Sequence, residues 1–170
     1  MNRLALLVSS LFLMAAAPGP GTTSIGTGDP RAWTAAPAPG VSATISRSTS
    51  APGGALRLDF DFGGKAGWAA ATRKVDLVLP ERWEIRLRLR GESLPNDLEI
   101  KLADPSGENV WWFRKRNTTF PQEFEALRVK QRQVEFAWGP AGGGAPSRIG
   151  SIEVTVTAGR GGKGWLEVAD

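Results

Sequence analysis

The sequence predicts an all-β fold, an antiparallel sandwich of two β-sheets, and three observations support this. Apolar and polar residues alternate with a period of two over about nine short segments. Gly, Pro and Asn residues separate these segments at short intervals, and no stretch has the period of a helix. Strands that follow one another without intervening helices form antiparallel sandwiches or barrels.

The clearest strand is 55–62, in which four apolar residues alternate with Arg57, Asp59 and Asp61. The segment 83–91 repeats the pattern and points Arg86, Arg88 and Arg90 away from the core. The same alternation predicts strands at 40–46, 74–80, 97–104, 124–130, 132–139, 149–158 and 164–170, and 109–116 is a further strand if a hairpin turn precedes it.

The first 31 residues precede the predicted domain. Residues 1–17 have the form of a secretory signal peptide: Arg3 is followed by an apolar run and then by Ala15 and Ala17. The apolar run is shorter than the roughly 20 residues that span a bilayer, so we expect no membrane span. Residues 18–31 are rich in Pro and Gly and predict a flexible linker. This leaves 32–170 as one secreted or periplasmic domain.

Composition excludes several kinds of chemistry. The chain has no Cys, His or Tyr, so it has neither a thiolate nor an imidazole for nucleophilic catalysis, and the usual ligands of zinc, copper and haem are absent. The net charge is +4, but the basic residues are scattered and form no dense block. We therefore expect a solvated surface and no nucleic-acid partner.

The sequence DPSG at 104–107 predicts a hairpin turn. Pro suits the second position of a type I turn, and Gly107 suits a following residue with positive φ. These features are typical of a three-residue loop closed by a glycine bulge, which would place Asp104 opposite Glu108.

That register decides which of two adjacent tryptophans faces the core. It places Trp112 inward, opposite Ile100, and Trp111 outward, opposite Lys101. A two-residue loop would shift the register by one residue and exchange the two tryptophans. In the expected register the outward face carries Glu99, Lys101, Trp111 and Phe113, with Arg86, Arg88 and Arg90 beside them.

Aromatic rings among charged side chains suit a sugar. The C–H face of a pyranose stacks on a ring, while carboxylates and guanidinium groups bond its hydroxyls. The predicted carbohydrate-binding residues are Trp111, Phe113, Glu99, Lys101 and Arg88. The alternative is a structural or protein-docking face, with a cross-strand charge ladder and covered aromatics.

The long segments 54–91, 96–121 and 127–140 resemble galactose-binding-domain-like jelly rolls. These bacterial modules are found ahead of discoidin-type domains in large secreted or periplasmic proteins, some of them glycoside hydrolases. The resemblance covers roughly residues 30–170. It implies a non-catalytic carbohydrate-binding module with a polysaccharide or oligosaccharide partner, and a downstream discoidin or glycoside hydrolase domain.

Two further possibilities come from the acidic residues. A glycosidase or lyase with two carboxylates would use Asp97 with Glu99, or Asp59 with Asp61, but cations beside Glu99 would keep it ionised. We therefore expect no enzyme activity. Many jelly rolls of the resembling superfamily hold a structural calcium, for which Asp59, Asp61 and Asp170 are candidates, although no calcium-loop spacing is present. We expect no other cofactor.

Overall fold

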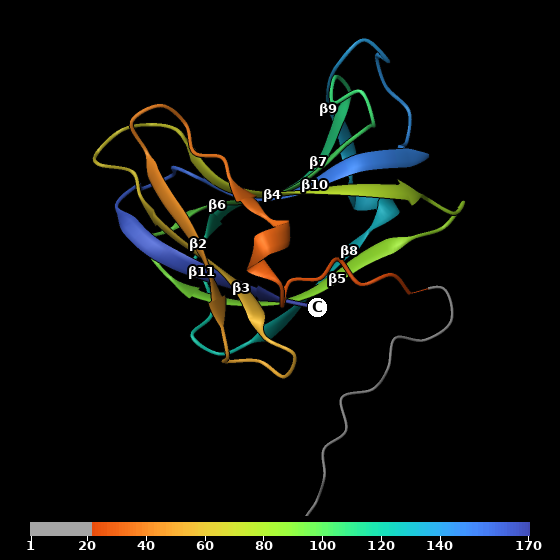
Figure 1. The fold of residues 1–170 in the computed structure, drawn as a ribbon. Coiled ribbons are helices and arrows are strands. Elements are labelled where there is room, and N and C mark those ends of the chain that lie inside the picture. Colours follow the sequence, from red (N-terminus) through yellow and green to blue (C-terminus); the bar gives the residue numbers. More distant parts are fainter. Residues whose placement is uncertain (1–21) are drawn as a thin grey trace, which may run out of the picture.

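The computed structural model describes residues 22–170 as a sandwich of two antiparallel sheets (Figure 1). The six-stranded sheet has the order β1 (Thr34–Ala35), β4 (Trp68–Val78), β10 (Arg148–Thr157), β6 (Asn96–Ala103), β7 (Val110–Thr118) and β9 (Glu135–Trp138). The five-stranded sheet has the order β2 (Ser42–Ser48), β3 (Ala55–Asp61), β11 (Lys163–Ala169), β5 (Glu84–Glu92) and β8 (Glu125–Lys130). Two 3₁₀ turns, Pro30–Ala32 and Gln131–Gln133, are the helical segments in this range. The all-β sandwich expected from the sequence is confirmed.

The core lies between the two sheets and is built from the inward residues of each alternating strand. Its main cluster includes Leu58, Phe60, Phe62, Leu98, Ile100, Val154, Val156 and Leu166. A second cluster is centred on Leu102, Ile149 and Ile152. Burial of each such side chain contributes about 1.5–3 kcal/mol relative to leaving it in water. Because successive side chains of a strand point to opposite faces, the residues between these inward ones lie on the outer faces of the two sheets.

Each strand predicted from alternation is present, but two segments were missed. The strand β4 begins at Trp68, six residues before the predicted start, because Ala69, Ala70 and Ala71 show no alternation and alanine has low strand propensity. The two-residue strand β1 is too short to give a pattern. Both segments lie at one edge of the six-stranded sheet, where β1 pairs with β4.

The predicted linker 18–31 overlaps a packed segment. The carboxylate of Asp170 accepts hydrogen bonds from the backbone N–H groups of Gly26 and Thr27 and from the hydroxyl of Ser24. Thr27 is buried, and its hydroxyl accepts a hydrogen bond from the backbone N–H of Asp170. Residues 24–27 of the predicted flexible linker therefore contact the end of the last strand. The predicted signal peptide 1–17 and residues 18–21 lie outside the described residues.

Among residues 22–170, no helix is long and apolar enough to cross a lipid bilayer.

Candidate functional site

The hairpin between β6 and β7 has a longer loop than predicted. Gly107 has φ of +77° and its N–H bonds to the carbonyl of Asp104, so the predicted turn and its glycine are confirmed. The ladder closes, however, between Asp104 and Asn109, and Glu108 lies outside it. The carboxylate of Asp104 accepts hydrogen bonds from the side chains of Asn109 and Ser106, which lower the pKa of Asp104 to about 2. These contacts stabilise a four-residue loop.

The extra loop residue shifts the register by one and reverses the predicted orientation of the tryptophans. Trp111 pairs with Leu102 on the inner side and is 6% exposed, and its indole N–H donates to the carbonyl of Gly144. Trp112 pairs with Lys101 on the outer side. The predicted outward positions of Trp111 and Phe113 are therefore wrong, since Phe113 packs against the main core cluster. A shift of one residue exchanges the two faces of a strand.

Arg88 does not share a face with the other predicted site residues. It lies on β5 of the five-stranded sheet, and its side chain points to the outer face of that sheet, opposite Ala169 of β11. Glu99 and Lys101 lie on β6, on the outer face of the six-stranded sheet. The expectation of one continuous site is therefore wrong for Arg88, because the two strands belong to different sheets.

The outer face of the six-stranded sheet brings together residues from four neighbouring strands. Cross-strand pairing aligns one row of Thr72, Glu153, Lys101 and Trp112, and a second row of Ala70, Thr155, Glu99 and Arg114. A hollow of about 600 Å³ lies over these rows. We name this hollow the tryptophan cleft. It is lined by Trp68, Lys74, Glu99, Lys101, Ala103, Gly107, Val110, Trp112, Arg114, Trp138, Ser151, Glu153 and Thr157.

Three tryptophans give the cleft its apolar surface. Trp112 and Trp138 meet edge to face, with ring centroids 5.7 Å apart and an interplanar angle of 89°. The guanidinium of Arg114 lies over the Trp112 ring, 5.4 Å from its centroid. Trp138 is 48% exposed and Trp68 is 44% exposed, although both are large apolar residues. Exposed tryptophans gathered in a hollow are typical of a binding surface.

A chain of ion pairs crosses the floor of the cleft. Lys101 Nζ lies 2.9 Å from Glu153 Oε1 and 3.4 Å from Glu99 Oε2. Arg114 Nη2 bonds to Asp97 at 2.8 Å, while its Nε lies 3.2 Å from Glu99 without hydrogen-bond alignment. The chain holds each charged group in a fixed position between neighbouring strands. Lys101 and Arg114 keep further N–H donors that can reach a bound hydroxyl.

Glu153 is held ionised by its neighbours. Burial opposes its charge, but the Lys101 ammonium and hydrogen bonds from Thr155, Lys101 and Thr72 outweigh burial and lower the pKa of Glu153. The carboxylate can therefore act as a fixed hydrogen-bond acceptor at neutral pH.

Within residues 22–170, no group of three or more acidic residues is arranged to hold a metal ion. Asp59 and Asp61 lie on the outer face of β3, whereas Asp170 bonds to the segment around Gly26. The structural calcium remains a prediction.

Sequence reasoning identified Glu99 and Lys101 as members of the cleft and missed its three tryptophans, Arg114 and Glu153. Trp112 was assigned to the core through the wrong register, and Trp68 lies in the missed half of β4. Glu153 alternates with apolar residues in 149–158, and this alternation could have indicated that Glu153 lies on the outer face. Trp138 follows a register shift between β7 and β9, which alternation does not reveal.

Comparisons with known proteins give structural matches alone. No family model matches the chain, and no curated protein matches it. A family 11 carbohydrate-binding module from Clostridium thermocellum, in complex with a β-1,3-1,4-mixed-linked tetrasaccharide, has a TM-score of 0.65 at 12% identity. That match covers 81% of this chain and 87% of the module.

Two further structures have the same architecture. The family 11 module of a cellulosomal cellulase of Clostridium thermocellum has a TM-score of 0.62 at 12% identity, covering 80% of this chain and 85% of that one. An exo-β-agarase has a TM-score of 0.51 at 11% identity, covering 82% of this chain and 23% of the agarase. At these identities the likeness concerns the fold. The chain has the jelly-roll sandwich of carbohydrate-binding modules, as the resemblance in the sequence implied.

Proposed function

We propose that the protein is a non-catalytic carbohydrate-binding module of a secreted or periplasmic bacterial protein, and that it binds a polysaccharide in the tryptophan cleft. The observation that carries the proposal is the hollow itself, in which exposed Trp68 and Trp138 surround a fixed set of hydrogen-bonding charges. The modules with the same fold support it, since one of them is described with a bound tetrasaccharide. A downstream discoidin or glycoside hydrolase domain belongs to the same proposal.

The chemistry of the cleft suits a sugar chain. Trp112 and Trp138 supply apolar ring surface for the C–H groups of a pyranose. Lys101 and Arg114 donate to hydroxyls, and Glu153 accepts from them. Each polar group is already held by its neighbours, so binding immobilises few side chains and loses little entropy.

The carboxylates of the cleft argue for binding without catalysis. Glycoside hydrolysis requires one carboxyl group that gives up a proton and one carboxylate that acts on the sugar or on water. Glu99 is paired with Lys101 and Arg114, and Asp97 is paired with Arg114. Both carboxylates are thus engaged by neighbouring cations, as expected of groups that hold a binding surface in place.

The test compares two adjacent tryptophans in affinity gels that contain soluble polysaccharides, including mixed-linked β-glucan. The variant Trp112→Ala should reduce retention by at least about tenfold, which corresponds to about 1.4 kcal/mol of binding free energy. Its free energy of unfolding should fall less than that of a variant at the neighbouring buried tryptophan, because Trp112 lies on the outer face.

The matched variant is Trp111→Ala, which should lower the free energy of unfolding by about 3–5 kcal/mol because this ring is buried. If no polysaccharide of a broad panel retards the wild type, the carbohydrate proposal fails. In that case the exposed tryptophans indicate the structural or protein-docking alternative.

A further inference from the structure

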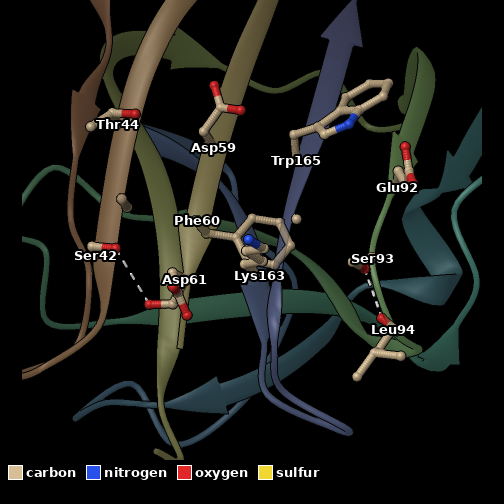
Figure 2. Close-up of a pocket in the computed structure, with 12 residues that line it drawn as sticks. Ser42, Thr44, Asp59, Phe60, Asp61, Glu92, Ser93, Leu94, Lys163 and Trp165 are labelled. Atoms are coloured by element: carbon tan, nitrogen blue, oxygen red, sulfur yellow. Dashed lines mark hydrogen bonds between the residues drawn. The ribbon is translucent and has the colours of Figure 1, made fainter. Parts of the chain in front are cut away.

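The outer face of the five-stranded sheet carries a second hollow, which Figure 2 shows. Its volume is about 780 Å³. It is lined by Ser42, Ala43, Thr44, Asp59, Phe60, Asp61, Glu92, Ser93, Leu94, Lys163, Gly164 and Trp165. We name it the Trp165 groove. It lies on a different sheet from the tryptophan cleft, and the two share no residue.

Strand pairing places the polar groups of this groove on both sides of its aromatic ring. Trp165 of β11 pairs with Asp59 of β3 and with Glu92 of β5. Neighbouring strands lie about 4.8 Å apart, so two carboxylates flank the ring at about 10 Å from each other at the backbone. In the adjacent row Lys163 pairs with Asp61. A ring between two carboxylates is suited to a hydroxyl-bearing sugar ring.

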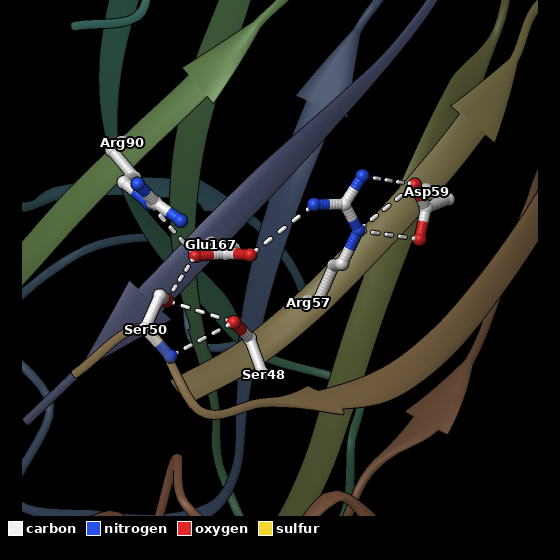
Figure 3. Close-up of polar contacts among 6 residues, drawn as sticks. All are labelled: Ser48, Ser50, Arg57, Asp59, Arg90 and Glu167. Atoms are coloured by element: carbon white, nitrogen blue, oxygen red, sulfur yellow. Dashed lines mark hydrogen bonds and ion pairs between the residues drawn. The ribbon is translucent and has the colours of Figure 1, made fainter. Parts of the chain in front are cut away.

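A polar network lies beside Trp165, in the next row of the same outer face, and Figure 3 shows its residues. Glu167 is 2% exposed and accepts from Arg57 at 3.2 Å and from Arg90 at 2.9 Å. Arg57 also bonds to Asp59 and lies over the Trp165 ring, 4.4 Å from its centroid. Asp59 and Trp165 are therefore held before any ligand arrives, which reduces the entropic cost of binding.

The charges of the groove differ from those of the tryptophan cleft. Three carboxylates and one ammonium, Asp59, Asp61, Glu92 and Lys163, give its lining a formal charge of −2. Three cations and two carboxylates, Lys74, Lys101, Arg114, Glu99 and Glu153, give the lining of the cleft a formal charge of +1. Asp61 and Glu92 have no ion-pair partner among residues 22–170. Because Arg57 pairs with Asp59, the two unpaired carboxylates are the groups that favour a ligand with positive charge and disfavour a uronate.

We propose that the Trp165 groove is a second sugar-binding subsite, which takes an unacetylated amino sugar. The ammonium of the sugar pairs with Asp61 or Glu92, its hydroxyls bond to Asp59 and Thr44, and its ring lies beside Trp165. The subsite extends the proposed function and does not depend on ligand binding in the tryptophan cleft.

The test follows the seven tryptophans of the chain by ¹⁹F NMR after replacement with 5-fluorotryptophan. Single Trp→Phe variants assign the resonances. The probes are a tetramer of unacetylated glucosamine, a galacturonate tetramer and a mixed-linked β-glucan tetrasaccharide. We expect the glucosamine tetramer to shift the Trp165 resonance in a saturable way and to leave the resonance of buried Trp33 unchanged. The galacturonate tetramer should leave Trp165 unchanged.

Neutralising the two unpaired carboxylates tests whether the ligand is recognised by its positive charge. The double variant Asp61→Asn, Glu92→Gln should weaken binding of the glucosamine tetramer about fivefold or more, because the ammonium loses both ion-pair partners. Asparagine keeps the acceptor that bonds to the N–H of Gly63, so the variant should fold. The control Glu81→Gln changes an exposed carboxylate outside the groove.

The outcomes separate this subsite from the function proposed for the cleft. If Trp112 and Trp138 respond to the β-glucan while Trp165 responds to no probe, the second subsite is overturned and the cleft proposal stands. An equal response of Trp165 to the glucosamine and galacturonate tetramers overturns the assignment to amino sugars. A response of Trp165 alone supports the subsite and contradicts β-glucan binding in the cleft.

Discussion

The two outer faces of the sandwich contain the same residue types, tryptophans set among acids and bases, but arrange them differently. On the five-stranded sheet, Arg57 and Arg90 both lie near Trp165 and both bond to the buried Glu167. On the six-stranded sheet, the exposed rings of Trp68 and Trp138 stand at the sides of a charge chain.

The difference teaches that the charged neighbours of a tryptophan decide how much of its ring a ligand can contact. Where cations lie over the ring, as at Trp165, they cover part of it, and the carboxylates beside it must then contribute more to the binding of a ligand. Among residues 22–170 no cation lies over the ring of Trp138, and this residue is 48% exposed. The following predictions test this contrast.

The largest expected effect is on the five-stranded face. Glu167→Ala leaves the partly buried guanidinium groups of Arg57 and Arg90 without their shared acceptor. We expect the free energy of unfolding to fall by about 3 kcal/mol, measured by urea denaturation. The matched change on the other face, Glu153→Ala, removes a more exposed carboxylate and should cost about 1–2 kcal/mol. Equal losses would remove the contrast between the two faces.

The next effect is a dependence on acid. Burial opposes the charge of Glu167, but hydrogen bonds from Ser50, Arg90, Ser48 and Arg57 outweigh it and lower the pKa of Glu167 to about 2 from its ordinary value of 4.5. A carboxyl group with a lowered pKa in the folded state contributes stability above its unfolded pKa and loses it as the pH falls toward the folded pKa. The protein should therefore lose stability between about pH 4.5 and about pH 2.

The variant Glu167→Gln should show a shallower loss over the same pH range, because its side chain cannot be protonated. Urea midpoints measured for both proteins across this range provide the comparison. Parallel curves for the two proteins would mean that other carboxylates, such as Glu153 with its lowered pKa, cause the acid dependence.

The smallest effect concerns the hairpin between β6 and β7, whose register decides which residues of β7 lie on the outer face. Gly107 has φ of +77°, and a Cβ added there would meet no atom within 4 Å, so Gly107→Ala should cost about 1 kcal/mol through backbone strain alone. The matched variant Gly150→Ala would place a Cβ 2.7 Å from the Cα of Pro105 and should cost more. No loss of stability in Gly107→Ala would contradict the positive φ.

The alternation of residues predicted the strands and their inward sides well, because burial of one strand face depends on local sequence. It did not predict how strands are offset, since the register between β6 and β7 depends on whether Glu108 or Asn109 closes the loop against Asp104. The side-chain contact between Asp104 and Asn109 favours the longer loop, and this contact is not visible in a hydrophobic pattern.

The alternation of apolar and polar residues also did not predict which strands belong to which sheet. The strand 83–91 precedes 97–104 in the sequence, which suggests that Arg88 and Glu99 are neighbours. In the structure β5 pairs with β11 and β8, and β6 pairs with β10 and β7. Long-range pairings of this kind depend on the packing of the whole sandwich, so residues from both faces were combined into one predicted site.

The bonds between Asp170 and the segment around Gly26 have a consequence for protein engineering. They bring two positions 144 residues apart in sequence into direct contact. A short peptide that joins Asp170 to Ser24 would close the packed chain into a ring, and a cut in the exposed loop at Gly142 would open it elsewhere. Such a circular permutant would keep both sheets, and its new ends would lie beside β9.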